Sequence, residues 1–214
     1  MGAPRAAWGA RSLGRSAVKP TQRRSAVCIL AGGEATRLPG KLALAVGDVP
    51  MLVRVYRNVS PGRETWLSTK GPLPDAIAAH VGAPQVVDRW PLRGPLSGLI
   101  STLSEMKAEW VFAVAGDAPL VDTAFIDRLE THLAPEYDAI VPMHEETKRI
   151  EPLAALYRRA AFVREGMPVL LGGEGTLRLV IDRLRTRFVP VRDEVAFANV
   201  NTPADYAKIR ETLA

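Results

Sequence analysis

Two glycines and two cations follow a short apolar run near the start of the chain. The run spans residues 26–30, and after it come Gly32, Gly33, Arg37 and Lys41. Adjacent glycines allow the backbone to turn its N–H groups toward a bound cluster of oxygens, because no Cβ stands in the way. Arginine and lysine supply the positive charge that a di- or triphosphate requires. This stretch therefore favours a phosphate-binding loop over an ordinary glycine-rich turn with solvated charges.

Two common nucleotide loops do not fit these residues. A Walker A loop that ends in Gly40-Lys41 needs glycine at position 35 and serine or threonine at position 42, but the chain has Ala35 and Leu42. The dinucleotide fingerprint G-x-G-x-x-G is also missing, since the two glycines are adjacent. The sequence thus argues against a P-loop ATPase and a standard dinucleotide-binding dehydrogenase.

Two aspartates follow apolar runs further along the chain. Asp88 ends the run that begins at residue 85, and Asp117 follows the run of residues 110–115. An aspartate after a strand often serves only as a helix cap or turn former. Two of them beside a phosphate loop instead indicate a site for Mg²⁺, which takes one or two carboxylates together with phosphate oxygens and water. Asp117 is the better candidate ligand, because a glycine precedes it and a proline follows two residues later.

Apolar runs and helix signals alternate along the chain, and this alternation must position the candidate site. Strands are predicted at 26–30, 42–46, 64–68, 85–88, 110–115, 139–142, 153–157 and 188–191. Helices are predicted at 50–59, 73–81, 95–106, 122–133, 160–171, 176–184 and 203–213, with Asp122 or Thr123 capping the fourth. Such alternation indicates an α/β fold with a mostly parallel sheet covered on both faces. Ligands of these sheets bind at the carboxyl ends of the strands, where both aspartates stand.

The pattern L-A-G-G-x-x-x-R, followed by a glycine and a lysine, resembles the signature of the molybdenum cofactor guanylyltransferase family. The matching residues are Leu30, Ala31, Gly32, Gly33, Arg37, Gly40 and Lys41. Four further segments resemble the same family: the D-x-x-x-x-x-G-P-L-x-G stretch from Asp88, the G-D-x-P-L stretch around Asp117, E-P-L-A-A-L-Y at 151–157 and N-V-N-T-P-A-D at 199–205. The resemblance covers nearly all of residues 26–209. It implies a Rossmann-like three-layer sandwich of the nucleotide-diphospho-sugar transferase type, with a mostly parallel central sheet.

The resemblance also implies roles for particular residues. In the family the first aspartate helps to bind the guanine nucleotide and the second holds Mg²⁺, so these roles fall on Asp88 and Asp117. Many members have an asparagine after the second strand, where this chain has Ser68-Thr69-Lys70, and Thr69 is the candidate contact there. The nucleotide contacts expected elsewhere are Leu30, Ala31, Gly32, Gly33, Lys41 and Asp117. The expected catalytic residues are Arg37, Lys41 and Asp117.

Asn199 and Asn201 are separated by one residue and lie just before the last predicted helix. The N-T-P triplet is a good helix start, with Thr202 as the cap and Pro203 at the first helical position, so these two residues need no functional explanation. The helix start does not explain the two asparagines. They are expected on one side of a preceding strand, where their amides could donate hydrogen bonds to a heteroaromatic molecule and accept hydrogen bonds from it. They are the candidates for binding the acceptor.

The function implied by the resemblance is Mg²⁺-dependent transfer of GMP from GTP to the phosphate of molybdopterin, with release of pyrophosphate. Lys41, Arg37 and the loop amides would hold the β- and γ-phosphates, and Asp117 would hold the metal. One alternative is a related nucleotidyltransferase that uses CTP or a sugar phosphate. Another is a non-catalytic nucleotide-binding accessory protein of molybdoenzyme maturation. With the first of these functions, transient contacts with molybdoenzymes or cofactor-synthesis proteins are also expected.

Charge is distributed unevenly along the 214 residues. Residues 1–24 hold six cations and no acid, whereas the remainder holds 22 cations and 23 acids. A disordered basic tail is predicted at 1–24, with a transit peptide or an over-long start as alternatives, and one nucleotidyltransferase domain at 25–214. A nearly neutral body argues against binding to nucleic acid. No apolar run is long enough to cross a bilayer, and the single cysteine, Cys28, fits a reducing cytoplasm.

Overall fold

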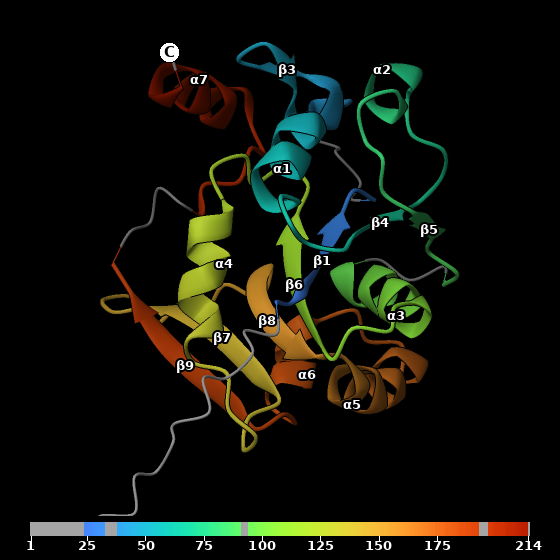
Figure 1. Ribbon diagram of the computed structural model, residues 1–214, viewed down its shortest axis with the longest axis vertical. Coiled ribbons are helices and arrows are strands. Elements are labelled where there is room, and N and C mark those ends of the chain that lie inside the picture. Colours follow the sequence, from blue (N-terminus) through green and yellow to red (C-terminus); the bar gives the residue numbers. More distant parts are fainter. Residues whose placement is uncertain (1–23, 33–37, 91–93, 193–196, 214) are drawn as a thin grey trace, which may run out of the picture.

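The computed structural model describes residues 24–32, 38–90, 94–192 and 197–213, so the predicted tail lies outside it except for Arg24. Seven strands of the described residues form one sheet in the order β5–β4–β1–β6–β8–β7–β9 (Figure 1). In that order they span Gln85–Val87, Thr65–Thr69, Ala26–Leu30, Trp110–Ala115, Ala154–Arg158, Ala139–His144 and Thr186–Val191. β8 runs antiparallel to both of its neighbours, and the other pairs are parallel. The prediction of a mostly parallel sheet is confirmed.

Strand β1 lies between β4 and β6 and pairs with both. Its last residue, Leu30, lies opposite Ser68 of β4 and Ala115 of β6. The run before Leu30 is buried and apolar, as a strand covered on both faces requires. Because the three strands end together, the loops that follow them leave the sheet at one edge. In Figure 1 the arrowheads of β1 and β6 point the same way, toward α7 (Pro203–Thr212) and the hairpin that contains β3 (Val49–Pro50).

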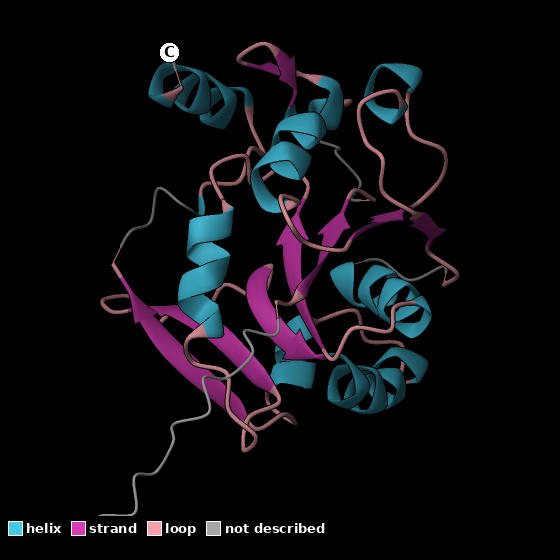
Figure 2. Cartoon of the chain, viewed as in Figure 1, coloured by secondary structure: helices cyan, strands magenta, loops and turns pink. Residues whose placement is uncertain are grey.

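Helices cover both faces of the sheet (Figure 2). α1 (Met51–Val59) and α4 (Thr123–Glu130) pack on one face, whereas α3 (Pro95–Glu105), α5 (Arg159–Leu171) and α6 (Leu177–Ile181) pack on the other. Asp122 caps α4 by accepting a hydrogen bond from the backbone N–H of Phe125 (2.8 Å). The predicted three-layer α/β sandwich is therefore confirmed. Across the described ranges, none of the helices is both long and apolar enough to cross a bilayer.

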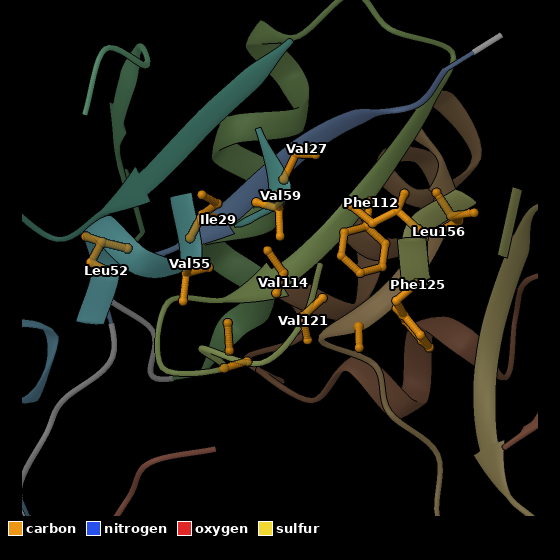
Figure 3. Packing of buried hydrophobic residues seen from close by; sticks show 14 of the residues in the cluster. Val27, Ile29, Leu52, Val55, Val59, Phe112, Val114, Val121, Phe125 and Leu156 are labelled. Carbon is orange, nitrogen blue, oxygen red and sulfur yellow. The ribbon is translucent and has the colours of Figure 1, made fainter. Parts of the chain in front are cut away.

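Alternate residues of the central strands enter two separate hydrophobic cores. Val27 and Ile29 of β1 join Phe112 and Val114 of β6 in the core beneath α1 and α4, as Figure 3 shows. Cys28 belongs to the core on the opposite face. This period of two follows from the pleat of a β-strand. Burial raises the pKa of the Cys28 thiol to about 12, so Cys28 is a neutral packing residue.

The segment after the glycine-rich loop differs from the prediction of one strand at 42–46. The chain instead forms the 3₁₀ helix η1 (Lys41–Ala43) and then a hairpin of β2 (Ala45–Val46) and β3 (Val49–Pro50). Gly40 causes the difference, because its φ of 68° turns the chain into η1. Its carbonyl accepts a hydrogen bond from the backbone N–H of Ala43 (2.8 Å).

The helix predicted at 73–81 is shorter in the structure, where α2 spans only Asp75–Ala78. Beyond Ala78 the backbone makes turn hydrogen bonds to the third residue back, such as His80 N–H to the Ile77 carbonyl (2.9 Å). Ile77 alone among the α2 residues is buried, so packing does little to extend the helix.

The last helix, α7 (Pro203–Thr212), packs on the hairpin. A small core joins the two elements, and its buried members are Val46, Met51, Val200 and Ile209. The Tyr206 hydroxyl donates a hydrogen bond to the Ala45 carbonyl (2.5 Å). Thr202 caps the helix, as predicted. The C-terminal helix therefore holds the turn from which Lys41 projects.

A buried ion pair lies at the opposite edge of the sheet, where β1 and β4 begin. The Arg63 and Glu130 side chains are 1% and 5% exposed. Arg63 donates to Glu130 (2.6 Å) and to the Ser25 carbonyl (3.0 Å), and it also contacts Asp127 of α4. Burial raises the pKa of Glu130, but hydrogen bonds from Arg63 and Ser25 outweigh it and leave the pKa below its usual value. The stability that Glu130 contributes is therefore present above its unfolded pKa of about 4.3 and is lost as pH falls through the lowered folded pKa.

We expect Arg63→Met to lower the free energy of unfolding by about 3–5 kcal/mol, because the change leaves the Glu130 carboxylate buried without its main partner. The matched control is Arg164→Met, which removes an ion pair with Glu165 from a site where Arg164 is 66% exposed. That control is expected to cost less than about 1 kcal/mol. Chemical denaturation of both variants measures the difference, and equal losses would contradict the assigned role of Arg63.

A second stability test concerns Gly98, where α3 lies against β4. A Cβ at residue 98 would lie 2.5 Å from the Ser68 hydroxyl oxygen. Alanine usually stabilises a helix interior over glycine by about 1 kcal/mol, but here we expect Gly98→Ala to destabilise the protein by about 1–3 kcal/mol through overpacking. Adding Ser68→Ala should recover most of the loss, since the remaining Ser68 Cβ lies 3.7 Å away. A melting temperature raised by Gly98→Ala alone would refute this prediction.

Candidate active site

Backbone hydrogen bonds join the loops that follow β4, β1 and β6. The Ala31 N–H donates to the Ser68 carbonyl (2.7 Å), and the Gly116 N–H donates to the Leu30 carbonyl (2.9 Å). Leu30 and Ala31, both predicted as nucleotide contacts, are thus fixed between the ends of the neighbouring strands. Their half-buried positions at the carboxyl edge leave part of each residue accessible to a ligand.

Two glycines allow these loops to approach one another closely. A Cβ on Gly32 would lie 3.1 Å from the backbone nitrogen of Lys70, and one on Gly116 would lie 3.0 Å from the Leu30 carbonyl oxygen. Larger residues would therefore push the loops apart. Gly33 and Arg37, both predicted to bind phosphate, lie outside the described residues.

Lys41 and Asp117, both predicted to be catalytic, are in direct contact. The Lys41 ammonium donates hydrogen bonds to Oδ2 of Asp117 and to Oδ1 of Asn201 (2.9 Å). The side chains of Lys41 and Asp117 are each 13% exposed. The three residues come from η1, from the loop after β6 and from the segment before α7. The fold thus gathers a cation, a carboxylate and an amide from distant parts of the sequence.

The surroundings of Asp117 fit a Mg²⁺ ion that is held mainly by a nucleotide. In the ranges that the structure describes, no cluster of three or more His, Cys, Asp or Glu residues could hold a metal. The Asp117 carboxylate does face a cation, the Lys41 ammonium, with the Asn201 amide oxygen close by. One carboxylate suits Mg²⁺, which keeps several waters and binds phosphate oxygens. Asp117 is the residue that would hold it.

Asp88 is held differently, with only 2% of its side chain exposed. Its carboxylate accepts hydrogen bonds from Lys70 (2.6 Å), the Ser97 hydroxyl (2.5 Å), the Ser101 hydroxyl (3.3 Å) and the Trp90 N–H (3.1 Å). Burial raises the pKa of Asp88, but the hydrogen bonds from Lys70, Ser97 and Trp90 outweigh it and leave the pKa below its usual value. This carboxylate therefore joins the chain after β4 to the start of α3. A contact with the base stays a prediction.

Thr69, the other predicted nucleotide contact in this region, is the last residue of β4 and is 1% exposed. Its hydroxyl has no hydrogen-bond partner within the described part of the chain. Burying an unpaired hydroxyl costs free energy, so this group stands out at the edge of the site. Its role in nucleotide binding stays a prediction.

The prediction that Asn199 and Asn201 lie on one side of a strand is wrong. Residues 198–201, all of them described, form no strand, and the two side chains reach different places. Asn201 contacts Lys41, whereas Asn199 is exposed and lines a separate groove. Val200 causes the separation: its side chain is fully buried against α7, and its N–H donates to the Asp117 carbonyl (2.9 Å).

The groove beside Asn199 has a volume of about 820 Å³ and brings together three cations that the sequence did not single out. Lys148 and Arg149 come from the turn between β7 and β8, and Arg178 comes from α6. These exposed cations lie in a turn and on a short helix, and their positions in the sequence match no known motif. The E-P-L motif beside Arg149 was therefore the only indication of a site in this region. The start of α3 and the connection between α5 and α6 complete the walls.

The groove opens at the same edge of the sheet as Asp117. Ala154, the first residue of β8, pairs with Val114, the residue before the end of β6. The turn that precedes β8 therefore leaves the sheet where β6 ends. A ligand in the groove would lie on the edge that also presents Lys41 and Asp117.

Known proteins of similar sequence match the chain over nearly its whole length. The "Probable molybdenum cofactor guanylyltransferase" of Carboxydothermus hydrogenoformans is 28% identical over 190 residues, which cover 86% of this chain and 93% of that protein. The protein of the same name from Natronomonas pharaonis is 28% identical over 199 residues, which cover 87% and 96%.

Solved structures show the same fold. The molybdopterin-guanine dinucleotide biosynthesis protein A of Archaeoglobus fulgidus superposes with a TM-score of 0.74 at 23% identity, covering 87% of this chain and 97% of that one. A cytidylyltransferase from Leptospira borgpetersenii superposes with a TM-score of 0.67 at 17% identity, covering 87% and 85%. Proteins that are named for the transfer of different nucleotides thus share this architecture. The fold alone therefore does not determine which nucleotide base an enzyme uses.

The sequence model of one protein family, the MobA-like NTP transferase domain, matches residues 27–190. That range includes Lys41, Asp88 and Asp117, and it ends before Asn199 and Asn201. The strand order, the gathered edge residues and the relatives agree with this match. The chain therefore belongs to the MobA-like NTP transferase family and is a nucleotidyltransferase.

Proposed function

We propose that the protein transfers GMP from GTP to the terminal phosphate of a molybdopterin-type acceptor, with Mg²⁺ as the cofactor and pyrophosphate as the second product. The observation that carries this proposal is the contact of Lys41 with Asp117 at the carboxyl edge of the sheet. Support for the guanylyl group and the acceptor comes from the names of the relatives in C. hydrogenoformans and N. pharaonis.

In the proposed reaction, an oxygen of the acceptor phosphate attacks the α-phosphorus of GTP, and the bond from that phosphorus to the oxygen bridging to the β-phosphate breaks. Lys41 and Arg37 would hold the β- and γ-phosphates and offset the charge of the leaving pyrophosphate. The chemistry supplied by Mg²⁺, when bound at Asp117, is neutralisation of charge between the α-phosphate and the acceptor. The attacking oxygen is already anionic, so no side chain has to remove a proton from it.

The acceptor would bind in the groove beside Asn199. A molybdopterin-type molecule combines a flat polar ring system with an anionic phosphate, and a groove of about 820 Å³ is of the size that small molecules occupy. Lys148, Arg149 and Arg178 supply positive charge along its walls. Arg149 pairs with Glu151 and Arg178 with Asp182, both at 2.9 Å. Both arginines are more than half exposed, and such pairs are weak enough to exchange for a phosphate.

The proposed role has consequences for where the protein works and what it contacts. The protein would work in the cytoplasm, which a chain with a single cysteine and hence no internal disulfide fits. It would also make transient contacts with molybdoenzymes or with other proteins of cofactor synthesis, because the product has to be delivered. Both remain predictions.

The test of the proposed function is a turnover assay with each of the four NTPs and Mg²⁺, with and without molybdopterin. We expect pyrophosphate release only when GTP and molybdopterin are present together. If CTP outcompetes GTP, the enzyme is a cytidylyltransferase and the proposed base is wrong. If a sugar phosphate supports turnover in place of molybdopterin, the proposed acceptor is wrong. Nucleotide binding without turnover under any condition would favour an accessory protein.

Asp117→Asn tests the site within that assay. The change keeps the size of the side chain but removes the charge that would anchor Mg²⁺, so we expect turnover to fall at least about 10²-fold. The exposed turn residue Asp48 provides the control, and Asp48→Asn should leave turnover unchanged. Thermal melting of both variants accompanies the assay. Nearly normal turnover in a folded Asp117→Asn protein would remove Asp117 from the metal site.

A further inference from the structure

Lys41 has two partners, and they differ in charge. Its ammonium donates to the Asp117 carboxylate and to Oδ1 of Asn201 (2.9 Å). A lysine side chain is a long flexible stem with a point charge at its end, so its position depends on the partners that hold the ammonium. If Asp117 holds Mg²⁺ in the working enzyme, that carboxylate is no longer available to fix Lys41. The neutral amide oxygen of Asn201 is the partner that remains.

Asn201 is itself held rigidly by the start of α7. The Asp205 carboxylate accepts hydrogen bonds from the Asn201 N–H (3.0 Å) and from the Thr202 N–H (2.8 Å). The Thr202 hydroxyl accepts in turn from the Asp205 N–H (3.2 Å), which completes a capping box. The backbone of Asn201 is thereby fixed without use of its side-chain amide.

The start of α7 also makes hydrogen bonds to the loop that carries Asp117 and to the hairpin that follows Lys41. The N–H of Val200 donates to the Asp117 carbonyl (2.9 Å), and Tyr206 donates to the carbonyl of Ala45, four residues after Lys41. Asn201 therefore keeps one geometry relative to the metal carboxylate and to the turn that carries the lysine.

We propose that Asn201 is a positioning residue that holds the Lys41 ammonium in place for the nucleotide phosphates, with the capping box of α7 as its support. An amide oxygen takes up one of the three ammonium N–H groups and leaves the others for phosphate oxygens. Because the amide is neutral, it also leaves the positive charge of Lys41 uncompensated, which a second carboxylate would not do. The assignment rests on the proposed roles of Lys41 and Asp117, and it replaces the earlier expectation that Asn201 contacts the acceptor.

The first experiment needs no ligand. Each variant is treated briefly with an amine-acylating reagent, and labelling of Lys41 is measured by peptide mass spectrometry, with exposed Lys208 of α7 as the internal reference. Loss of a hydrogen bond worth about 1 kcal/mol should raise the Lys41 labelling rate about fivefold in Asn201→Ala. Asn201→Asp keeps an acceptor oxygen and should hold the rate at or below that of the unmutated protein. Equal rates in the unmutated protein and Asn201→Ala would overturn the proposal.

The second experiment is a thermodynamic cycle of GTP binding, measured by calorimetry with Mg²⁺ and without acceptor. We expect Asn201→Ala to weaken binding about tenfold in the unmutated background, the scale of one charge-assisted hydrogen bond. In the Lys41→Met background the same change should have no further effect, because Asn201 acts through Lys41. Equal weakening in both backgrounds would show that Asn201 contacts a ligand itself and would overturn the proposal.

The two experiments separate this proposal from the proposed function. Faster labelling of Lys41 in Asn201→Ala, together with no GTP binding by the unmutated protein, would reject the function and support the holding contact. GTP binding that depends on Lys41 but is weakened independently by Asn201→Ala would keep the function and reject the positioning role. Melting temperatures of all variants test whether unfolding is the cause, and Asn201→Asp is the variant to use if Asn201→Ala does not fold.

Discussion

The register of β1 between β4 and β6 is the constraint on which the rest of the structure depends. Leu30 ends its strand opposite Ser68 and Ala115, so the loops after all three strands leave the sheet at one edge. A shift by one residue would exchange the two faces of β1 and move Val27 and Ile29 out of their core. Burial of that alternating run therefore determines both the core and the position of the site.

The charges at that edge are arranged in pairs. Lys41 contacts Asp117, and Lys70 contacts Asp88, so each carboxylate faces a cation. A triphosphate that recruits Lys41 must compensate Asp117 in another way, and a bound metal ion would do so. Under the proposed function the lysine and the metal would depend on each other, because one carboxylate would serve both. Asp88 differs, since its four hydrogen bonds use it to fix the chain after β4 against α3.

Much of the architecture was predictable because buried parallel strands have continuous apolar runs. Residues 26–30 and 110–115 could be assigned from composition alone, and the aspartate after the second run followed from the strand-end rule. The antiparallel direction of β8 was not predictable from apolar pattern, since that pattern carries no direction. The nine residues between β7 and β8 are too few for a helical crossover, and this was the available clue.

Residues of the candidate site could be predicted where the local backbone restricts the residue type. They could not be predicted where tertiary packing determines the position of the side chain. Gly32 and Asp117 belong to the first kind. Asn199 and Asn201 belong to the second, because burial of Val200 sends their side chains to different places. The groove cations Lys148, Arg149 and Arg178 also belong to the second kind, since they meet only after two separate connections fold over one edge.

A crystal structure of the protein with Mg²⁺ and a non-hydrolysable GTP analogue would test the proposed roles of Lys41, Asp117 and Asn201 together. We expect metal density on the Asp117 carboxylate and the Lys41 ammonium on phosphate oxygens of the analogue. We also expect Lys41 to keep its contact with Oδ1 of Asn201 while it leaves Asp117. A nucleotide bound away from the carboxyl edge of β1 and β6, or a Lys41 that stays on Asp117 with the analogue bound, would refute the proposed roles of these residues.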